Sequence, residues 1–446
     1  MTEGEHMFTI GVRDYRRQPD CSFVLGKRME TTRKAIMFIV DGLGDRPIKE
    51  LGGRTPLESA RTPSFDSLAK RGICGLMDPL APGIRVGTDV GHLALFGYNP
   101  FRVYWGRGPI EAAGVGIELE PRDVALRCNF ATVDNEGIIV DRRAGRIRHG
   151  TRLLAEALND LQLEEDVQIV FREATEHRAV LVLKGKELSA EITNSDPGAG
   201  REGEPVQPVR ARRPGVALAE RTAAVVNRFI HTSHDVLKKH PVNRERLQHG
   251  LPPANILITR GAGMAVRMRS LADRFHITGG CVVGESTVKG IALMSGFRVY
   301  SSPSLTANVD TDLDEKARLT AEALRDCNFV VVHVKGADIA SHDNDPHGKI
   351  EFLERVDAMV GKVVEALEEP EQTYMGLTAD HATPCAIREH SADPVPVVIS
   401  GDDVLVDGVE RYGERDCARG GLLRINANEF LLTLLDFIGV TYRFGA

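Results

Sequence analysis

The sequence predicts an α/β protein with a doubly wound, mostly parallel sheet and an inserted α+β domain. Two observations carry this prediction. Short apolar runs such as Phe329–Val334 are typical of strands that are buried on both faces, as in parallel sheets. Helical patterns such as Ile350–Leu367 lie between these runs, and strands that alternate with helices indicate an α/β domain.

The first apolar run is Lys34–Val40, which ends at Asp41. A helix is predicted next at Thr62–Arg71, with Thr62 as its N-cap and Pro63 as its first helical residue. Further strands are predicted at 255–259, 299–301, 329–334, 374–378 and 395–399, and further helices at 314–324 and 350–367. Because open α/β sheets bind ligands beyond the carboxyl ends of their strands, we expect the functional site where these runs end.

The middle of the chain has a different character. It contains strand-like pieces at 125–133 and 179–183 and a long stretch at 194–215 that is rich in glycine, proline and arginine. Loops of that length are usually functional or disordered. We therefore predict that the middle of the chain is an inserted domain that covers the active site. The predicted division is an N-terminal extension at 1–33, a catalytic domain made of 34–120 and 251–446, and an inserted substrate-binding domain at 121–250.

The composition excludes several classes of function. The chain has 446 residues, more than one hydrophobic core usually holds. Its net charge of −7 and its aromatic content of 5% argue against a nucleic-acid partner. No apolar run is long enough to span a membrane. The seven cysteines are scattered and form no CxxC pair, which favours a reducing, cytoplasmic location.

Six side chains of types that bind divalent ions follow the predicted strands. They are Asp41, Asp338, His342, Asp380, His381 and His390. Asp338 and His342 are four residues apart, so they would point the same way on a helical turn. Aspartate and neutral histidine suit Mn, Zn, Mg or Co. Six ligands are too many for one structural zinc, and they fit two catalytic ions, which lie roughly 3.5–4 Å apart in phosphoryl-transfer sites.

Thr88 lies on a turn that could meet these six residues. Gly87 and Gly91 flank it, which suits a sharp strand-to-helix turn that exposes the side chain. A threonine hydroxyl is a weak nucleophile at neutral pH, and metal coordination activates it. The amides at the start of the following helix would face a phosphate. The sequence therefore predicts metal-assisted phosphoryl transfer.

Several motifs resemble those of the alkaline phosphatase superfamily and, within it, the archaeal-type cofactor-independent phosphoglycerate mutases. The resemblance runs from about Lys34 to the end of the chain. Its carriers include IVDGLGDRP at 39–47, VGTDVGHLALFGYNP at 86–100, RGPIEAAGVG at 107–116, VKGADIASHD at 334–343 and TADHATPCAIREHSADPVPV at 378–397. The resemblance implies an alkaline-phosphatase-like fold, two divalent metal ions and interconversion of 3- and 2-phosphoglycerate.

The resemblance also implies a division of the ligands. One ion would be held by Asp338, His342 and His390, and the second by Asp41, Asp380 and His381, with Thr88 as a further ligand and as the nucleophile. The mechanism of the family goes through a phosphoenzyme, here a phosphothreonine. The nucleophile takes the phosphate from one hydroxyl of a glycerate and returns it to the other.

Charged side chains in the matching motifs are candidates for binding the substrate. A phosphoglycerate carries a carboxylate and a phosphate, and arginine pairs with both groups bidentately. The candidates are Asp89, His92, Arg142, Arg146, Arg172, His177, Arg178, Arg260 and Lys335. The alternative for each arginine is a solvated surface charge, and for Asp89 it is a helix cap. The run at 279–287 lacks the lysine of a phosphate-binding loop and is predicted to enter a helix without a preceding strand.

Two departures from the family pattern keep other substrates open. Thr88 stands where the family usually has serine, and Gly198 in the run NSDPGAG stands where many members have histidine. The alternative is a related phosphoryl or phosphonyl transferase that uses another donor, such as a nucleotide-linked one, and a glycerate- or homoserine-like acceptor. The third hypothesis is a phosphatase, because water could hydrolyse the phosphoenzyme. The sequence is compatible with a homo-oligomer and does not determine the oligomeric state.

Overall fold

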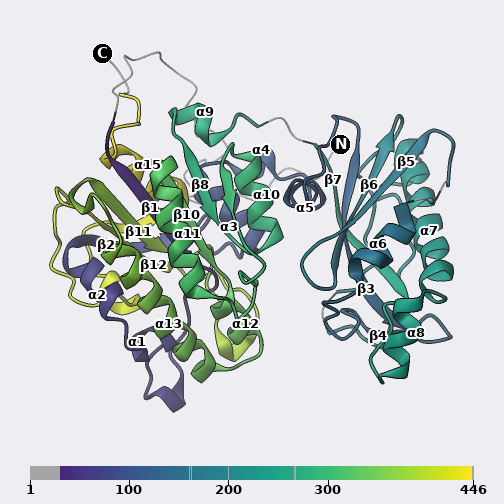
Figure 1. Ribbon diagram of the computed structural model, residues 1–446, viewed down its shortest axis with the longest axis horizontal. Helices are drawn as coiled ribbons and strands as arrows, with labels where there is room; N and C mark the ends of the chain where they lie inside the picture. The colour runs from purple at the N-terminus through teal and green to yellow at the C-terminus, as the bar shows by residue number, and fades with distance from the viewer. Residues whose placement is uncertain (1–30, 160, 162, 199, 266–267, 444–446) are drawn as a thin grey trace, which may run out of the picture.

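The computed structural model describes residues 31–443 except 160, 162, 199, 266 and 267. Two sheets organise the described residues, one of eight strands and one of five (Figure 1). The larger sheet has the order β13-β2-β12-β11-β1-β10-β8-β9. Its strands are β1 (Lys34–Val40), β2 (Gly72–Asp78), β8 (Gly279–Val282), β9 (Arg298–Tyr300), β10 (Phe329–Val334), β11 (Thr373–Thr378), β12 (Val395–Ser400) and β13 (Leu423–Asn426). Most of the predicted N-terminal extension, residues 1–30, lies outside the described residues.

The core of this sheet is parallel. β1 pairs in parallel with β10 on one side and with β11 on the other, while β12 runs antiparallel to both of its neighbours. Every residue of β10 and β11 is buried. This follows from their mostly apolar residues and from the helices that cover both faces of the sheet. The predicted fold class is therefore confirmed.

Helices pack on both faces of the larger sheet. On one face α2 and α11 contact α13, and on the other face α10 and α15 contact α3. The helices of this unit are α1 (Pro56–Ser59), α2 (Pro63–Lys70), α3 (Thr88–Leu95), α4 (Pro100–Val103), α5 (Gly108–Gly114), α9 (Leu271–Phe275), α10 (Ser286–Met294), α11 (Leu313–Asp326), α12 (Gly336–His342), α13 (Pro346–Glu365), α14 (Glu414–Cys417) and α15 (Ala427–Phe437). Within the part of the chain that the structure describes, 3-10 turns lie at Lys49–Leu51, Pro370–Gln372 and Cys385–Ile387.

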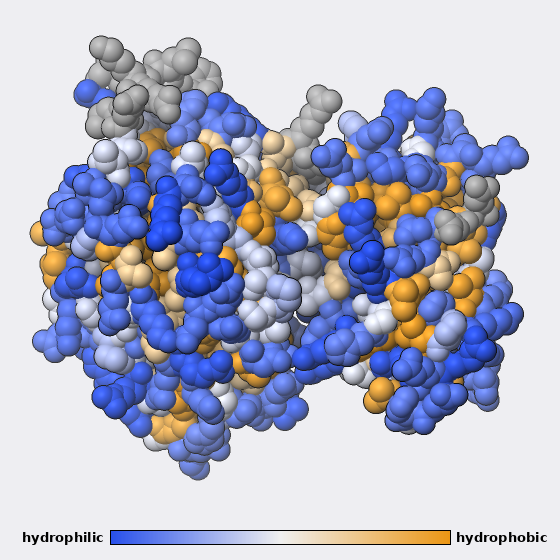
Figure 2. Space-filling view, viewed as in Figure 1, coloured by the Kyte–Doolittle hydropathy of each residue, from blue (hydrophilic) through white to orange (hydrophobic). Residues whose placement is uncertain are grey.

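The smaller sheet lies beside the first and has its own hydrophobic core (Figure 1). Its strands are antiparallel, and β3 at its centre pairs with β6 and β7. Its elements are β3 (Val124–Val133), β4 (Ile139–Asp141), β5 (Val167–Glu173), β6 (Arg178–Gly185), β7 (Ile256–Met264), α6 (Thr151–Asn159), α7 (Ala217–Leu237) and α8 (Pro241–Gln248). Hydrophilic side chains cover much of the visible face of both units (Figure 2).

Two predictions about strands were wrong. The run 255–259, which we expected in the larger sheet, belongs to β7 and pairs with β3 of the smaller sheet. The run 279–287 itself begins with a strand, β8, which pairs in parallel with β10 and precedes α10. Its two leading glycines obscured the strand pattern in the sequence. Because β7 ends beyond residue 250, we propose that the inserted unit extends from β3 to β7.

α5 joins the two units through close backbone contacts. A Cβ atom on Gly290 of α10 would lie 1.9 Å from the carbonyl oxygen of Ile110, and one on Gly108 would lie 2.0 Å from that of Ala125 in β3. Only glycine leaves room for these approaches. α5 therefore packs between α10 of the larger unit and the smaller sheet. Among the described residues, no helix is both long and apolar enough to cross a membrane.

Candidate active site

The predicted metal ligands gather at the carboxyl ends of three adjacent strands. Asp41 directly follows β1, α12 follows β10 with Asp338 in its first turn, and Asp380 and His381 follow β11. Thr88 is the first residue of α3. The turns are tight, since a Cβ atom on Gly91 would lie 2.4 Å from the carbonyl oxygen of Asp380. Gly91 thus allows α3 to bring Thr88 against the end of β11.

One group of atoms converges on His381. Its Nε2 lies 3.2 Å from Asp380 Oδ2, 3.4 Å from Asp41 Oδ1 and 3.5 Å from Thr88 Oγ1. Neither of these two carboxylate oxygens has a hydrogen-bond donor among the described residues. Buried carboxylate oxygens are costly without a partner. Asp41, Asp380 and His381 therefore have the proximity and the vacant lone pairs that a metal ion requires.

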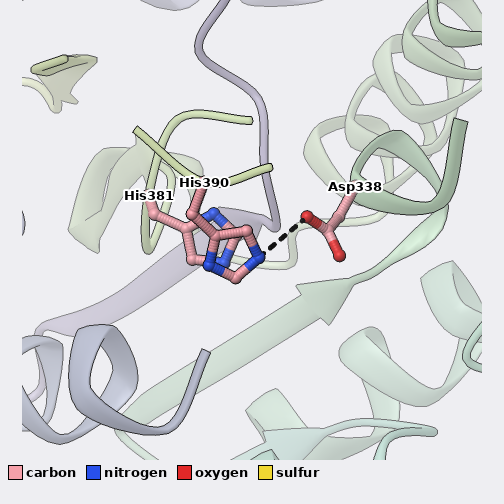
Figure 3. Close-up of side chains that lie close together, drawn as sticks. All are labelled: Asp338, His381 and His390. Carbon is pink, nitrogen blue, oxygen red and sulfur yellow. Dashed lines mark ion pairs between the residues drawn. The ribbon is translucent and has the colours of Figure 1, made fainter. Parts of the chain in front are cut away.

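A second group forms around Asp338 (Figure 3). Asp338 Oδ1 lies 3.4 Å from His342 Nε2 and 3.6 Å from His390 Nε2. The rings of His381 and His390 are stacked, with centroids 3.7 Å apart. Asp338, His381 and His390 have atoms close enough together to hold an ion, so His381 borders both groups.

The outer nitrogens of the three histidines are already engaged. His342 Nδ1 lies 2.8 Å from the carbonyl oxygen of Arg388, and His390 Nδ1 lies 2.8 Å from that of Val86. His381 Nδ1 lies 3.0 Å from the hydroxyl of Thr383. A carbonyl can only accept, so Nδ1 carries the proton in the neutral rings of His342 and His390, and Nε2 then has a free lone pair. This arrangement is usual for metal-binding histidines.

Lys335 lies at the centre of the acidic residues. Its Nζ donates to Asp41 Oδ2 and Asp338 Oδ2, each at 2.8 Å, and to Thr88 Oγ1 at 3.2 Å. Burial would lower the pKa of Lys335, but Asp338 and Asp41 outweigh it and raise that pKa. Burial would likewise raise the pKa of Asp41, but Lys335 and the hydrogen bond from His333 hold it well below its ordinary value. Both groups are therefore charged at neutral pH.

Two site residues escaped the sequence reasoning. His333 Nε2 lies 3.1 Å from Asp41 Oδ2, and the hydroxyl of Thr383 donates to Asp338 Oδ1 at 2.8 Å. Burial lowers the pKa of His333, so its ring is neutral and can donate to Asp41. A histidine within the apolar run Phe329–Val334 was a usable signal, whereas Thr383 offered none.

The candidates beside Thr88, Asp89 and His92, also hold the start of α3 in place. His92 Nδ1 lies 2.7 Å from the carbonyl oxygen of Thr88 and 3.3 Å from Asp380 Oδ2. Asp89 accepts hydrogen bonds from the hydroxyl of Tyr104 at 2.7 Å and from the amide of Val90 at 3.0 Å. Both side chains thus contact residues of the turn that holds Thr88.

A group of arginines and glutamates lies between the two units. Arg107, the N-cap residue of α5, donates from Nε to Glu111 Oε1 at 2.9 Å, and Arg178 of β6 donates to Glu285 Oε1 at 3.4 Å. Burial would raise the pKa of Glu285, but Arg178, Arg107 and Lys335 lower it to about 2. The arginine group is therefore electrostatically connected to Lys335, which lies among the candidate metal ligands.

Arg127 belongs to this group and was also missed. Its side chain is 4% exposed, and its Nε lies 3.7 Å from Glu111 Oε1 with no hydrogen-bond partner among the described residues. Burial and the neighbouring Arg107 and Arg260 lower the pKa of Arg127. A guanidinium keeps its proton in proteins, so a bound anion would relieve this unfavourable environment. The charged residue in the middle of the apolar strand β3 was the signal in the sequence.

The other predicted substrate residues are placed differently. Arg142 makes a bidentate, buried pair with Asp196, at 2.6 and 2.8 Å, and Arg260 lies 4.0 Å from the same carboxylate. Burial and the nearby Arg178 lower the pKa of His177 to about 2, so its ring is neutral.

Arg146 and Arg172 face other partners. Arg146 is half-exposed and lies 3.7 Å from Asp343 Oδ1, next to His342. Arg172 donates instead to the carbonyl oxygens of Val115 and Gly116, just after α5. These contacts give Arg172 a place in the junction between the units.

Comparison with known proteins identifies the family. The family model of the 2,3-bisphosphoglycerate-independent phosphoglycerate mutases matches residues 69–243. A mutase of that description from Methanopyrus kandleri is 47% identical over 420 residues, which cover 93% of this chain and 98% of the relative. One from Methanothermobacter thermautotrophicus is 44% identical and covers 93% of this chain and 100% of the relative.

Solved structures agree with these sequence relatives. A protein from Pyrococcus horikoshii is 35% identical, with a TM-score of 0.79 over 94% of this chain and 100% of that chain. The cofactor-independent phosphoglycerate mutase from Thermoplasma acidophilum is 33% identical, with a TM-score of 0.63 over 92% of this chain and 100% of that chain. The chain therefore belongs to the family of 2,3-bisphosphoglycerate-independent phosphoglycerate mutases.

Proposed function

We propose that this enzyme interconverts 3- and 2-phosphoglycerate by moving the phosphoryl group onto Thr88 and back. The observation that carries the proposal is the approach of Thr88 Oγ1, Asp41 Oδ1 and Asp380 Oδ2 to within 3.5 Å of His381 Nε2. A hydroxyl in such surroundings can act as an activated nucleophile. Membership of the mutase family supports the choice of substrate.

The donor set fits two divalent ions, Mn, Zn, Mg or Co. One would be held by Asp41, Asp380 and His381 with Thr88 as a further ligand, and the other by Asp338, His342 and His390. The unpartnered oxygens of Asp41 and Asp380 support this assignment, as do the free Nε2 lone pairs. Bound ions of this kind lower the pKa of a coordinated hydroxyl and neutralise the charge of a transferring phosphoryl group.

The transfer consists of two half-reactions, phosphorylation of Thr88 and return of the phosphoryl group to the glycerate. Thr88 Oγ1 forms a bond to phosphorus as the bond between phosphorus and the C3 oxygen breaks, and the proton that Thr88 loses is matched by the one that the departing oxygen gains. The C2 hydroxyl then reverses these events and restores Thr88. Lys335, 3.2 Å from Thr88 Oγ1, neutralises the negative charge of the moving group.

The arginine group is suited to the carboxylate of the substrate. Arg127 has an unpartnered Nε and cationic neighbours, and a carboxylate accepts from a guanidinium in bidentate fashion. Glu285 connects this group electrostatically to Lys335. A substrate with two anionic ends could therefore have its phosphate at Thr88 and its carboxylate near Arg127.

An assay of the purified enzyme tests the proposal. Metal-loaded enzyme is supplied with 3-phosphoglycerate and no bisphosphoglycerate, and 2-phosphoglycerate and inorganic phosphate are followed together. We expect 2-phosphoglycerate to form much faster than free phosphate. Faster release of phosphate would make the enzyme a phosphatase, and no turnover with any of the four metals would reject both activities.

Replacing Arg127 by methionine should weaken substrate binding. The change keeps much of the side-chain volume and removes the charge, so we expect KM for 3-phosphoglycerate to rise by roughly 10- to 100-fold, as for the loss of a charged hydrogen bond. Arg152→Gln is the control, because Arg152 is 78% exposed and pairs with Glu156 on the surface. An unchanged KM in the Arg127 variant would remove Arg127 from the substrate site.

A further inference from the structure

A buried ion pair lies outside the ligand shell, between Lys349 of α13 and Asp45. Lys349 Nζ lies 2.9 Å from Asp45 Oδ2, and both side chains are 0% exposed. Taking two charges out of water is costly, and an apolar pair of similar volume is often as stable or more stable. Stability alone therefore gives little reason for this pair, and its hydrogen bonds indicate another role.

Those hydrogen bonds fasten two loops to each other. Lys349 uses its three donors on Asp45, on the carbonyl oxygen of Gly44 at 3.4 Å and on that of Thr383 at 3.2 Å. The Asp45 carboxylate accepts in turn from the amide of Cys385. Gly44 and Asp45 belong to the loop that begins at Asp41, and Thr383 and Cys385 belong to the loop that begins at Asp380. Lys349 thus ties the loops that follow β1 and β11.

Thr383 connects the two linked loops to the candidate metal ligands. Its amide donates to the carbonyl oxygen of Gly44 at 3.0 Å, so its backbone is held from both sides. Its hydroxyl donates to Asp338 Oδ1 at 2.8 Å and lies 3.0 Å from His381 Nδ1. A shift of the Thr383 backbone therefore moves the hydroxyl that orients one ligand from each group.

We propose that the Lys349–Asp45 ion pair is a positioning device that sets the affinity of the site for divalent ions. The inference rests on the proposed function, since it takes the clusters around Asp338 and His381 to be metal sites. Lys349 acts through Gly44 and Thr383 and is a positioning residue. Partners that orient ligands in this way typically contribute 10- to 100-fold to metal affinity.

The experiment distinguishes an effect of ligand positioning on metal affinity from an effect of the buried charges on stability. Metal-stripped enzyme is titrated with Mn²⁺ by calorimetry, and Tm is measured on the same samples. Lys349→Met leaves Asp45 buried without its partner and should lower both Tm and metal affinity. The double variant Asp45→Asn/Lys349→Met removes both charges and should regain most of the lost Tm. Its Kd for Mn²⁺ should nevertheless remain about 10- to 100-fold above that of the wild type.

A second buried lysine supplies the matched control. Lys316 of α11 is 1% exposed and lies near Cys281, so Lys316→Met makes the same substitution away from both loops. Its Kd for Mn²⁺ should equal that of the wild type. A double variant that binds Mn²⁺ as tightly as the wild type would overturn the inference. Wild-type enzyme that binds none of Mn²⁺, Zn²⁺, Mg²⁺ and Co²⁺ would overturn the proposed metal site itself.

Discussion

Thr88→Val should abolish turnover while the protein keeps its fold. Valine has nearly the shape of threonine and lacks the hydroxyl, and Thr88 is only 5% exposed in a well-packed turn. Deleting a catalytic nucleophile costs on the order of 10⁴-fold or more in kcat. The measurement is the rate of formation of 2-phosphoglycerate, with Tm as the check on folding.

Thr88→Ser is the matched control for that experiment. Serine keeps the hydroxyl and removes one methyl group, so kcat should stay within about tenfold of the wild type. A Thr88→Val variant that turns over at more than a hundredth of the wild-type rate would exclude Thr88 as the nucleophile. If Thr88→Ser instead gained much mutase activity, the wild-type enzyme would be specialised for another acceptor.

His381→Leu should have the second largest effect. Burial lowers the pKa of His381, so its ring is neutral and a leucine leaves no unpaired charge. Its Nε2 approaches Asp41, Asp380 and Thr88, and its ring stacks on His390. Because bound ions supply several kcal/mol of charge stabilisation, we expect kcat to fall by about a thousandfold or more.

Metal content distinguishes this effect from general damage. The His381 variant should bind fewer equivalents of Mn²⁺ than the wild type in a calorimetric titration. His347→Leu removes an exposed histidine near the start of α13 and should change neither kcat nor metal content. Full metal occupancy together with wild-type kcat in the His381 variant would contradict the assignment.

The strands that carry the candidate metal ligands could be predicted because their sequences have a clear pattern. β1 is apolar after Lys34 and β10 is apolar except for His333, and their observed limits equal the predicted ones. The parallel pairing of β1 with β10 and β11 then brings Asp41, Asp338 and Asp380 to one edge. Local pattern and sheet topology point to the same site, which is why sequence reasoning reached it.

Other parts of the site depend on contacts that no local pattern encodes. β7 is apolar enough for either sheet, and only its pairing with β3 decides where it lies. Thr383 and Lys349 gain their importance from the packing of α13 against the loops after β1 and β11. Arg142 sits in a matching motif, yet its bidentate partner Asp196 comes from a distant loop.

The most direct test of phosphoryl transfer through Thr88 is to trap the phosphoenzyme. Metal-loaded enzyme is mixed with 3-phosphoglycerate, quenched in acid within one turnover and digested, and the peptide that contains Thr88 is analysed by mass spectrometry. We expect phosphate on Thr88, formed and lost fast enough to support the production of 2-phosphoglycerate. Mutase turnover with phosphate on another residue, or with no phosphorylated residue at any time, would contradict it.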